Sequence, residues 1–247
     1  MGSFVGVFDH VTVRVSDRQA SERFYFPVLT AIGVDMTHSL GEFIEWGDFS
    51  LTEATAWNPV TRGLHIGFGA SSRDQVDEFW RVGTEAGYRD DGKPGQRPVY
   101  GDDYYGGFLL DPDGNSAEAV HFEGVGRGMD HLWIRVANVE RSKRFYETIA
   151  PHAGIRTTVD TPERVGFEGG EPGSFSVLSG EHVTSGLHMA FTAATNEAVD
   201  DFHRAATEAG YRDNGDPGER PAYHRGYYSA YALDPDGNNI ELVNHNR

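Results

Sequence analysis

The sequence predicts an α+β protein made of two copies of one domain, and three observations support this prediction. First, the chain repeats itself: residues 63–123 align without gaps to residues 186–246, with 32 identities in 61 positions. Second, short segments in each copy alternate apolar and polar residues, which is typical of strands with one buried face. Third, amphipathic segments with capping residues predict helices between those strands. We therefore expect two domains, residues 1–124 and 129–247, around the glycine-rich segment EGVGRGM.

The composition excludes several classes of protein and partner. The formal net charge is −17, which disfavours nucleic acid or an anionic membrane surface as a partner. The chain has no cysteine, so disulfides, thiolate metal sites and cysteine nucleophiles are excluded. The N-terminal segment MGSFVGVFDH lacks a signal-peptide pattern, and no apolar run is long enough to span a membrane. We expect a cytoplasmic protein that could form a homodimer.

The first half of each copy predicts a strand, a helix and further strands. The segments HVTVRV and HLWIRV alternate, so that His10 and His131 lie on the polar face of their strands. Ser16-Asp17 and Asn138 are suitable N-caps for two helices that carry the motif RFY. The segments EFIEW and DFSLTE then predict a hairpin in the first copy.

The second half of each copy predicts another strand, helix and strands. In LHIGF, His65 lies opposite the apolar residues of its strand. An amphipathic helix is expected from about Arg73 to Ala86, closed by Gly87. The sheets are expected to have helices on one face and a polar inner face.

The hexapeptide LDPDGN occurs twice, at 110–115 and 233–238. Its proline fixes φ and its glycine accepts a positive φ, so it predicts a turn between two strands. In the strand after the second copy, Glu241 lies on the face opposite Ile240 and Leu242, together with the histidines. The turn is therefore structural, and its effect is to aim a carboxylate.

Two histidines and one glutamate per copy are candidate metal ligands. They are His10, His65 and Glu118 in the first copy, and His131, His188 and Glu241 in the second. Two neutral imidazoles and a carboxylate bind a divalent transition metal and leave positions open for substrate or water. Fe, Mn, Zn and Ni all suit such ligands. A structural role that both copies share by descent is the alternative.

The chain resembles the vicinal oxygen chelate superfamily, which includes glyoxalases, bleomycin and fosfomycin resistance proteins and extradiol dioxygenases. The resemblance is carried by DHVTVRVSDRQASERFY, GLHIGF and LDPDGNSAEAV, and by their second copies DHLWIRVANVERSKRFY, GLHMAF and LDPDGNNIELV. It implies tandem domains, each of two βαβββ units that form a curved mixed-sheet cup with helices outside. It also implies that the six residues above are the ligands.

The resemblance leaves two groupings of these ligands open. If each cup forms within one copy, the ligands group as they occur in the sequence. If units exchange between copies, His10 groups with His188 and Glu241, and His131 with His65 and Glu118.

The resemblance also implies a small oxygen-bearing substrate chelated to the metal. Glyoxalase I-like members add a fourth acidic ligand; Asp48 or Glu53 could serve in the first copy, whereas GSFSVLSG in the second has no acid. The segment AYHRGYYSAYALDPDGNNIE resembles the extradiol dioxygenase signature and implies His224 and Tyr231 as catalytic residues. The signature departs at Ala222 and Ala230, and the first copy has Gly101 and Phe108 in place of its His and Tyr.

We therefore expect a metal-dependent enzyme, with dioxygenase-like cleavage favoured slightly over isomerase or lyase chemistry. The alternative is a metal-free protein that sequesters a small molecule, as resistance members of the family do. In a third version, one domain is active and the other is structural or regulatory.

Overall fold

A computed structural model describes residues 7–39, 41–169 and 173–246. Most of MGSFVGVFDH, on which the signal-peptide expectation rests, lies outside the described residues. Within the described ranges no helix combines the length and apolarity that a membrane span requires. The chain divides into two compact units, Thr12–Trp133, here called the N-terminal unit, and Met1–Val11 with Ile134–Arg247, here called the C-terminal unit.

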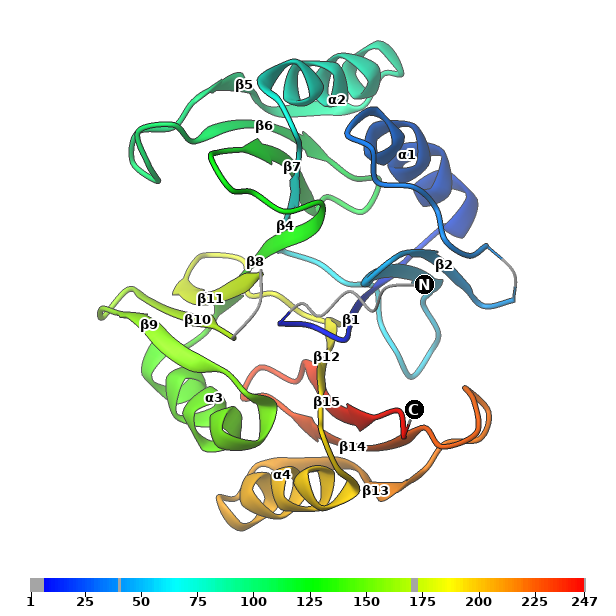
Figure 1. The fold of residues 1–247 in the computed structure, drawn as a ribbon, viewed down its shortest axis with the longest axis vertical. Helices are drawn as coiled ribbons and strands as arrows, with labels where there is room; N and C mark the ends of the chain where they lie inside the picture. Colours follow the sequence, from blue (N-terminus) through cyan, green and yellow to red (C-terminus); the bar gives the residue numbers. More distant parts are fainter. Residues whose placement is uncertain (1–6, 40, 170–172, 247) are drawn as a thin grey trace. The chain divides into compact units, whose positions relative to one another are not determined.

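The N-terminal unit contains two helices and the strands of the first copy (Figure 1). They are β1 (His10–Val15), α1 (Arg18–Ala31), β2 (Phe43–Trp46), β3 (Phe49–Glu53), β4 (Leu64–Gly69), α2 (Arg73–Glu85), β5 (Arg89–Gln96), β6 (Tyr105–Leu110), β7 (Ser116–His121) and the first part of β8 (Gly128–Val136). The first two residues of β1 belong to the other unit.

The C-terminal unit follows a similar order with the strands of the second copy, and it has one additional strand between its first helix and the strand that opens its second half. After the end of β8 they are α3 (Val139–Ala153), β9 (Arg156–Asp160), β10 (Arg164–Glu168), β11 (Ser174–Ser179), β12 (His188–Thr192), α4 (Asn196–Glu208), β13 (Arg212–Glu219), β14 (Tyr228–Leu233) and β15 (Asn239–Asn244). The predicted α+β class with tandem domains is confirmed.

The helices begin where the sequence places capping residues. Asp17 accepts a hydrogen bond from the backbone N–H of Ala20 at the start of α1, and Asn138 does the same for Arg141 at the start of α3. Each satisfies one of the backbone donors that a helix start leaves free. Of the pair Ser16-Asp17, the structure uses Asp17 as the cap.

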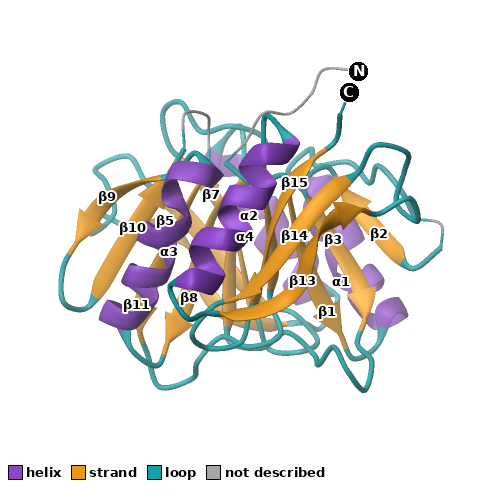
Figure 2. Ribbon diagram, turned by 90° about the horizontal axis from the view of Figure 1, so that it is seen from below, coloured by secondary structure: helices purple, strands orange, loops and turns teal. Residues whose placement is uncertain are grey.

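In each unit one parallel strand pair positions the candidate ligands. Strand β4 pairs in parallel with β7, and β12 with β15. Antiparallel pairing then adds β6 and β5 to β7, and β14 and β13 to β15; the last three lie side by side in Figures 1 and 2. Helices α2 and α4 pack on these strands. Neighbouring strands thus bring a histidine and a glutamate from distant sequence positions onto one face.

The repeated hexapeptide is a hydrogen-bonded turn, as predicted, and its first aspartate and its asparagine are buried in both copies. In the first copy, Asp111 Oδ1 accepts from the backbone N–H groups of Asp113 and Asn115. The Asn115 side chain accepts from Leu64 N at the start of β4, and Tyr25 of α1 donates to Asp111 Oδ2. The second copy repeats this network. The turn therefore fixes the start of β7 or β15 and with it the direction of the glutamate.

Strands β5 and β13 carry a sequence signal that is typical of turns. Their sequences, RDDGKPGQ and RDNGDPGE, contain two glycines and a proline each. Both nevertheless pair along one side with β6 or β14, with register shifts at the glycines. Proline is tolerated there because these are edge strands, which pair with a neighbouring strand on one side only.

Candidate metal centres

The six predicted ligands form two triads, and the structure has the exchanged grouping. His10, His188 and Glu241 come together in the C-terminal unit, and His65, His131 and Glu118 in the N-terminal unit. His10 reaches its partners because Asp9 N donates to Ala190 O of β12. Each triad therefore combines the first strand of one copy with two strands of the other copy.

The C-terminal triad has three donor atoms that point at one another. His10 Nε2 lies 3.0 Å from His188 Nε2. Glu241 Oε2 lies 3.1 Å from His188 Nε2 and 3.6 Å from His10 Nε2. The His10 side chain is 26% exposed, so this triad can be reached from solvent.

The N-terminal triad has nearly the same geometry but is closed. His65 Nε2 and His131 Nε2 lie 3.2 Å apart, and Glu118 Oε2 lies 3.0 Å from the first and 3.3 Å from the second. The two histidine side chains are only 7% and 8% exposed.

Both donor sets fit a divalent transition metal. Two ligands bound at about 2.1 Å and at right angles to each other lie about 3.0 Å apart, close to these separations. All four histidines offer Nε2. The Nδ1 atoms of His10, His65 and His131 each face a side-chain oxygen that can accept a hydrogen bond, as in metal-bound histidines, whereas His188 Nδ1 faces the amide nitrogen of Asn239. Three protein ligands leave coordination positions for a substrate.

A second shell of side chains is common to both triads. Asp9 Oδ1 lies 2.8 Å from His10 Nδ1, and Asp130 Oδ2 lies 2.8 Å from His131 Nδ1. The hydroxyl of Tyr227 donates to Glu241 Oε1 at 2.8 Å, and Tyr104 donates to Glu118 Oε1 at 2.9 Å. Each glutamate thus keeps Oε2 for a metal while its other oxygen is held.

The ionisation of these groups follows from burial and close charge. Burial opposes the charge of Glu118, but hydrogen bonds from His131 and His65 outweigh it and lower the Glu118 pKa to about 2. Burial likewise opposes protonation of His131, yet Asp130 and Glu118 raise the His131 pKa to about 9. Burial and the nearby Glu241 raise the pKa of Tyr227. Without a metal, a proton therefore holds the N-terminal triad together.

The two triads differ in what orients the strand histidine. His65 Nδ1 lies 3.2 Å from Ser116 Oγ, which donates to Asp91 at 2.7 Å. At the corresponding positions of the C-terminal unit, Asn239 contacts His188 Nδ1 at 2.7 Å and Asn214 contacts Asn239. An anionic chain supports His65, whereas two neutral amides support His188.

The residues around the N-terminal triad close it tightly. A Cβ at Gly67 would lie 2.2 Å from the His131 ring, and one at Gly106 would lie 2.4 Å from Glu118 Oε1. Trp133 packs on His65, with ring centroids 5.2 Å apart, and Phe108 lies 6.0 Å from the same ring.

Polar residues take two of these places at the C-terminal triad. Ser229 stands where the other copy has Gly106, and Tyr231 where it has Phe108. Tyr231 pairs with Glu241 on the neighbouring strand, its ring centroid lies 6.3 Å from that of His188, and Ser229 Oγ donates to its hydroxyl at 3.0 Å. Burial and Glu241 raise its pKa, so the phenol keeps its proton.

The other sequence-predicted residues lie farther from the donor atoms. His224 connects to the C-terminal triad through two intermediate residues, described below. Asp48, in the turn between β2 and β3, and Glu53, at the end of β3, are not members of either triad. Burial raises the pKa of Asp48 to about 6. Arg97 and Arg220 stack over Phe108 and Tyr231.

A family model described as the glyoxalase/bleomycin resistance protein/dioxygenase superfamily matches residues 7–119 and again 128–242. The chain belongs to this superfamily. The resemblance stated from the sequence is therefore confirmed, and so is the tandem arrangement of superfamily domains.

Solved structures of the superfamily share the fold over nearly the whole chain. Glyoxalase I from Zea mays is 19% identical, with a TM-score of 0.70, over 97% of this chain and 92% of that chain. A proposed dioxygenase from Bacillus subtilis is 13% identical, with a TM-score of 0.66, over 100% and 87%. No curated protein matched the sequence. At these identities the likeness shows the fold alone.

Sequence reasoning missed most of the second shell. A signal existed for Tyr104 and Tyr227, because a tyrosine pair precedes the hexapeptide in both copies. A signal also existed for Asp9 and Asp130, because each precedes a ligand histidine. Strict strand alternation places these aspartates on the opposite face, which is why they were not predicted. His245 had no signal, since its counterpart is Phe122.

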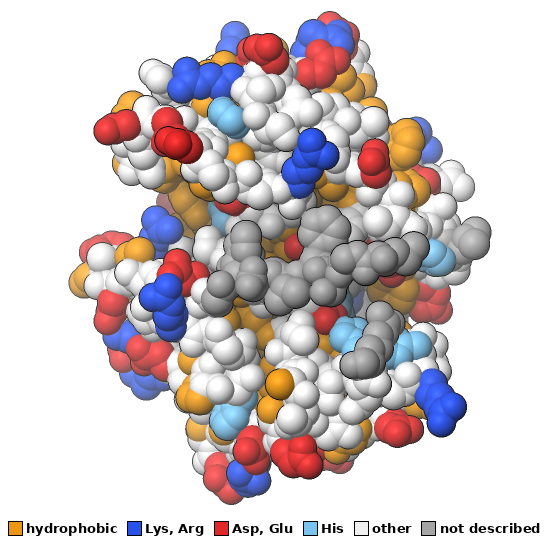
Figure 3. Space-filling view, viewed as in Figure 1, with side chains coloured by type: hydrophobic (Ala, Val, Ile, Leu, Met, Phe, Trp, Pro, Cys, Tyr) orange, Lys and Arg blue, Asp and Glu red, His pale blue; other side chains and the backbone are white. Residues whose placement is uncertain are grey.

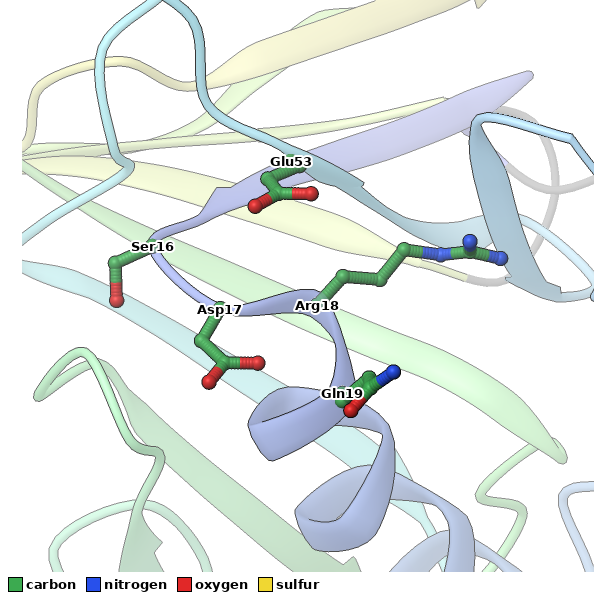
Figure 4. Close-up of a pocket in the computed structure, with 5 residues that line it drawn as sticks. All are labelled: Ser16, Asp17, Arg18, Gln19 and Glu53. Atoms are coloured by element: carbon green, nitrogen blue, oxygen red, sulfur yellow. The ribbon is translucent and has the colours of Figure 1, made fainter.

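The surface features shown in the figures lie outside the triads. On the face shown in Figure 3, acidic and basic side chains are interspersed on each unit. Figure 4 shows a pocket at the start of α1, lined by Ser16, Asp17, Arg18, Gln19 and Glu53. Asp17 already caps the helix there, and no triad residue lines this pocket.

Proposed function

We propose that the protein is a metal-dependent enzyme whose active site is the C-terminal triad. Its substrate is a small organic molecule with two adjacent oxygen atoms, and dioxygenase-like cleavage is favoured over isomerase or lyase chemistry. The observation that supports this most strongly is the convergence of His10, His188 and Glu241 around one point with an exposed side. The N-terminal triad, closed by apolar rings, would hold its metal for stability.

The side chains in and around the C-terminal triad have separate roles. When bound, a divalent metal would stabilise negative charge on the two substrate oxygens. His10, His188 and Glu241 Oε2 would hold that metal. Tyr227 donates a hydrogen bond to Glu241 Oε1, which would leave Oε2 to hold the metal.

Tyr231 is the residue we assign to proton donation. Its oxygen accepts from Ser229, and its raised pKa keeps its own proton in place at neutral pH. It lies beside Glu241 and His188, where substrate oxygens on the metal would be. Phe108 at the corresponding position of the N-terminal unit cannot donate a proton.

The dioxygenase-like reaction is tested by oxygen consumption with catechols. The protein is loaded anaerobically with Fe(II) or Mn(II), mixed with a panel of catechols, and compared with His188→Ala and His65→Ala. The account predicts that His188→Ala abolishes turnover and that His65→Ala, if folded, keeps it. The exposed His182→Ala is the matched control. Turnover lost only in His65→Ala would contradict the assignment.

Two other outcomes would lead to a different proposed function. Isomerisation or lysis without oxygen uptake, dependent on His188, would keep the site and replace the reaction. Tight binding of a small molecule by protein that takes up no metal would favour the sequestering alternative.

A further inference from the structure

A chain of hydrogen bonds leads from the C-terminal triad to a part-exposed histidine. His10 Nδ1 lies 2.8 Å from Asp9 Oδ1, and Asp9 Oδ2 lies 2.7 Å from His245 Nε2. His245 Nδ1 lies 2.8 Å from His224 Nε2, and His224 Nδ1 lies 2.9 Å from the carbonyl oxygen of Arg225. All of these residues belong to the C-terminal unit.

At each end of the His224–His245 pair, a ring nitrogen faces a hydrogen-bond acceptor. A backbone carbonyl only accepts, so His224 Nδ1 must carry a hydrogen. An aspartate carboxylate also only accepts, and Asp9 Oδ2 lies 2.7 Å from His245 Nε2. His245 Nε2 must therefore carry a hydrogen as well.

The contact between the two rings needs a third hydrogen. His224 Nε2 and His245 Nδ1 are 2.8 Å apart, which is a hydrogen bond only if one of them donates. The pair then has three hydrogens on four ring nitrogens, whereas two neutral imidazoles have two. One excess proton is required for all three hydrogen bonds to exist together.

We propose that His224 and His245 are an imidazole–imidazolium pair that shares one excess proton and neutralises Asp9 behind the metal ligand His10. They are positioning residues, because neither contacts the triad. The effect on the metal rests on the proposed function, whereas the shared proton rests only on the hydrogen bonds of the chain.

The N-terminal unit provides an internal comparison. The positions that correspond to His224 and His245 are Gly101 and Phe122, which have no ionisable group. Phe122 stacks on Tyr104, and His245 contacts the corresponding Tyr227 in an edge-on arrangement. The same space is thus filled in both units, but only the C-terminal unit places an imidazolium beside the second-shell aspartate.

The charge balance predicts a difference between the metals at the two triads. A second-shell carboxylate makes its histidine a stronger donor to the metal. The cation on the far side of Asp9 weakens this effect at His10, while Asp130 keeps its full influence on His131. A metal at the C-terminal triad would therefore be held less tightly and would withdraw more charge from substrate oxygens.

Among the described residues, the pair contacts one acidic side chain and one tyrosine. Asp9 is the anion, and it also lies 3.2 Å from Thr192 Oγ1. Tyr227 packs against both rings, with centroids 5.2 Å and 5.3 Å away, and its raised pKa keeps it neutral. Tyr223 lies on Tyr227. The aspartate is thus the counter-ion of the shared proton.

The first test counts the protons directly. Long-range ¹H–¹⁵N spectra of histidine-labelled, metal-free protein at about pH 7 report the protonation of each ring nitrogen. We expect both nitrogens of one ring, or an exchange average over the pair, to be protonated, with His224→Gly and His245→Phe assigning the signals. Two neutral rings with one proton each would overturn the proposal.

The second test measures the effect on metal affinity. Zn²⁺ is titrated against a competing chelator while ring nitrogens of His188 and His65 report the two triads separately. His245→Phe and His245→Gln are both expected to raise the affinity of the C-terminal triad about tenfold and to leave the N-terminal triad unchanged. The glutamine variant keeps a donor to Asp9 without the charge, so it separates charge from packing.

The direction in which the Zn²⁺ affinity changes distinguishes the proposal from a purely structural role of His245. If His245 only supported the site structurally, its removal would lower the affinity, and an unchanged or lower affinity in the glutamine variant would overturn the proposal. Failure of Zn²⁺ to bind either triad would contradict the proposed function, while the proton count in metal-free protein still decides the pair.

Discussion

The two triads have the same three donors in nearly the same geometry, yet their surroundings differ in polarity and access. Around the N-terminal triad, the rings of Trp133 and Phe108 lie against His65, and two glycines let the ligands lie against the backbone. Around the C-terminal triad, Tyr231 and Ser229 add hydroxyls, and His10 is partly exposed. Metal binding constrains the donors, and the second shell determines what a bound metal can do.

The largest expected effect is on the pH dependence of stability of the metal-free protein. The His131 pKa is raised to about 9, so its contribution is complete below about pH 6.5 and is lost as pH rises through 9. The Glu118 pKa is lowered to about 2, so its contribution is present above about pH 4.5 and is lost as pH falls through 2. The contribution is greatest between about pH 4.5 and 6.5, and amounts to about 3 kcal/mol.

Urea unfolding of chelator-treated protein across this pH range checks the prediction. Glu118→Gln should flatten the profile, because the neutral amide no longer favours the charged imidazole. An identical profile in wild type and variant would show that the N-terminal triad contributes no proton-dependent stability.

Replacement of Tyr231 should affect turnover next most strongly. Tyr231→Phe removes the proposed proton donor and leaves the three metal ligands in place, so kcat should fall about 10²-fold with unchanged metal content. The reciprocal change Phe108→Tyr, in the N-terminal unit, is the matched control and should leave turnover unchanged. Equal kcat values for wild type and Tyr231→Phe would remove Tyr231 from the mechanism.

The supports of the strand histidines can be exchanged between the units. The double variant Asn239→Ser/Asn214→Asp gives His188 the anionic chain that supports His65. A more basic His188 should raise the Zn²⁺ affinity of the C-terminal triad about tenfold. Competition with a chelator measures this, and a decrease would mean that the amides of Asn239 and Asn214 support the ligand better than a carboxylate does.

The smallest expected effect is the one that Asp48 of the first copy has on the free energy of unfolding. Its pKa is raised to about 6, so ionisation destabilises the folded protein as pH rises from about 4 through 6. Asp48→Asn should therefore stabilise the protein by about 1–2 kcal/mol at neutral pH and leave it unchanged near pH 4. Urea unfolding at the two pH values is the measurement, and equal effects at both would contradict the assignment to charge.

The six candidate ligands could be proposed from the sequence because they follow from short-range patterns. Alternation placed His10 and His65 on the polar faces of their strands, and the hexapeptide turn set the direction of Glu118 and Glu241. The grouping of the ligands could not be predicted, because the pairing of β1 with β12 is a long-range event that local patterns leave open. The resemblance had named both groupings, and the structure has the exchanged one.

The residues that hold the ligands could not be predicted from the sequence for a different reason. Asp9 bonds to the residue beside it, against strict strand alternation, and His245 acts through Asp9 rather than on the metal. His224 was predicted as a catalytic residue, and the structure connects it to His10 through His245 and Asp9. Because His224 is linked to His10 through these two residues rather than directly, we propose a positioning role for His224, and Tyr231 is the residue to which we assign a catalytic role.

The central claim is that each triad binds one metal ion and that the ion at the C-terminal triad is the one that leaves more readily. The most direct test is elemental analysis of protein purified without added metal or chelator, repeated for Glu241→Ala and Glu118→Ala and after brief dialysis against a chelator. The account predicts close to two ions per chain in the wild type, one in each variant, and a faster loss from Glu118→Ala, which keeps only the C-terminal ion. Wild-type protein that stays empty after incubation with Fe, Mn, Zn and Ni would contradict it.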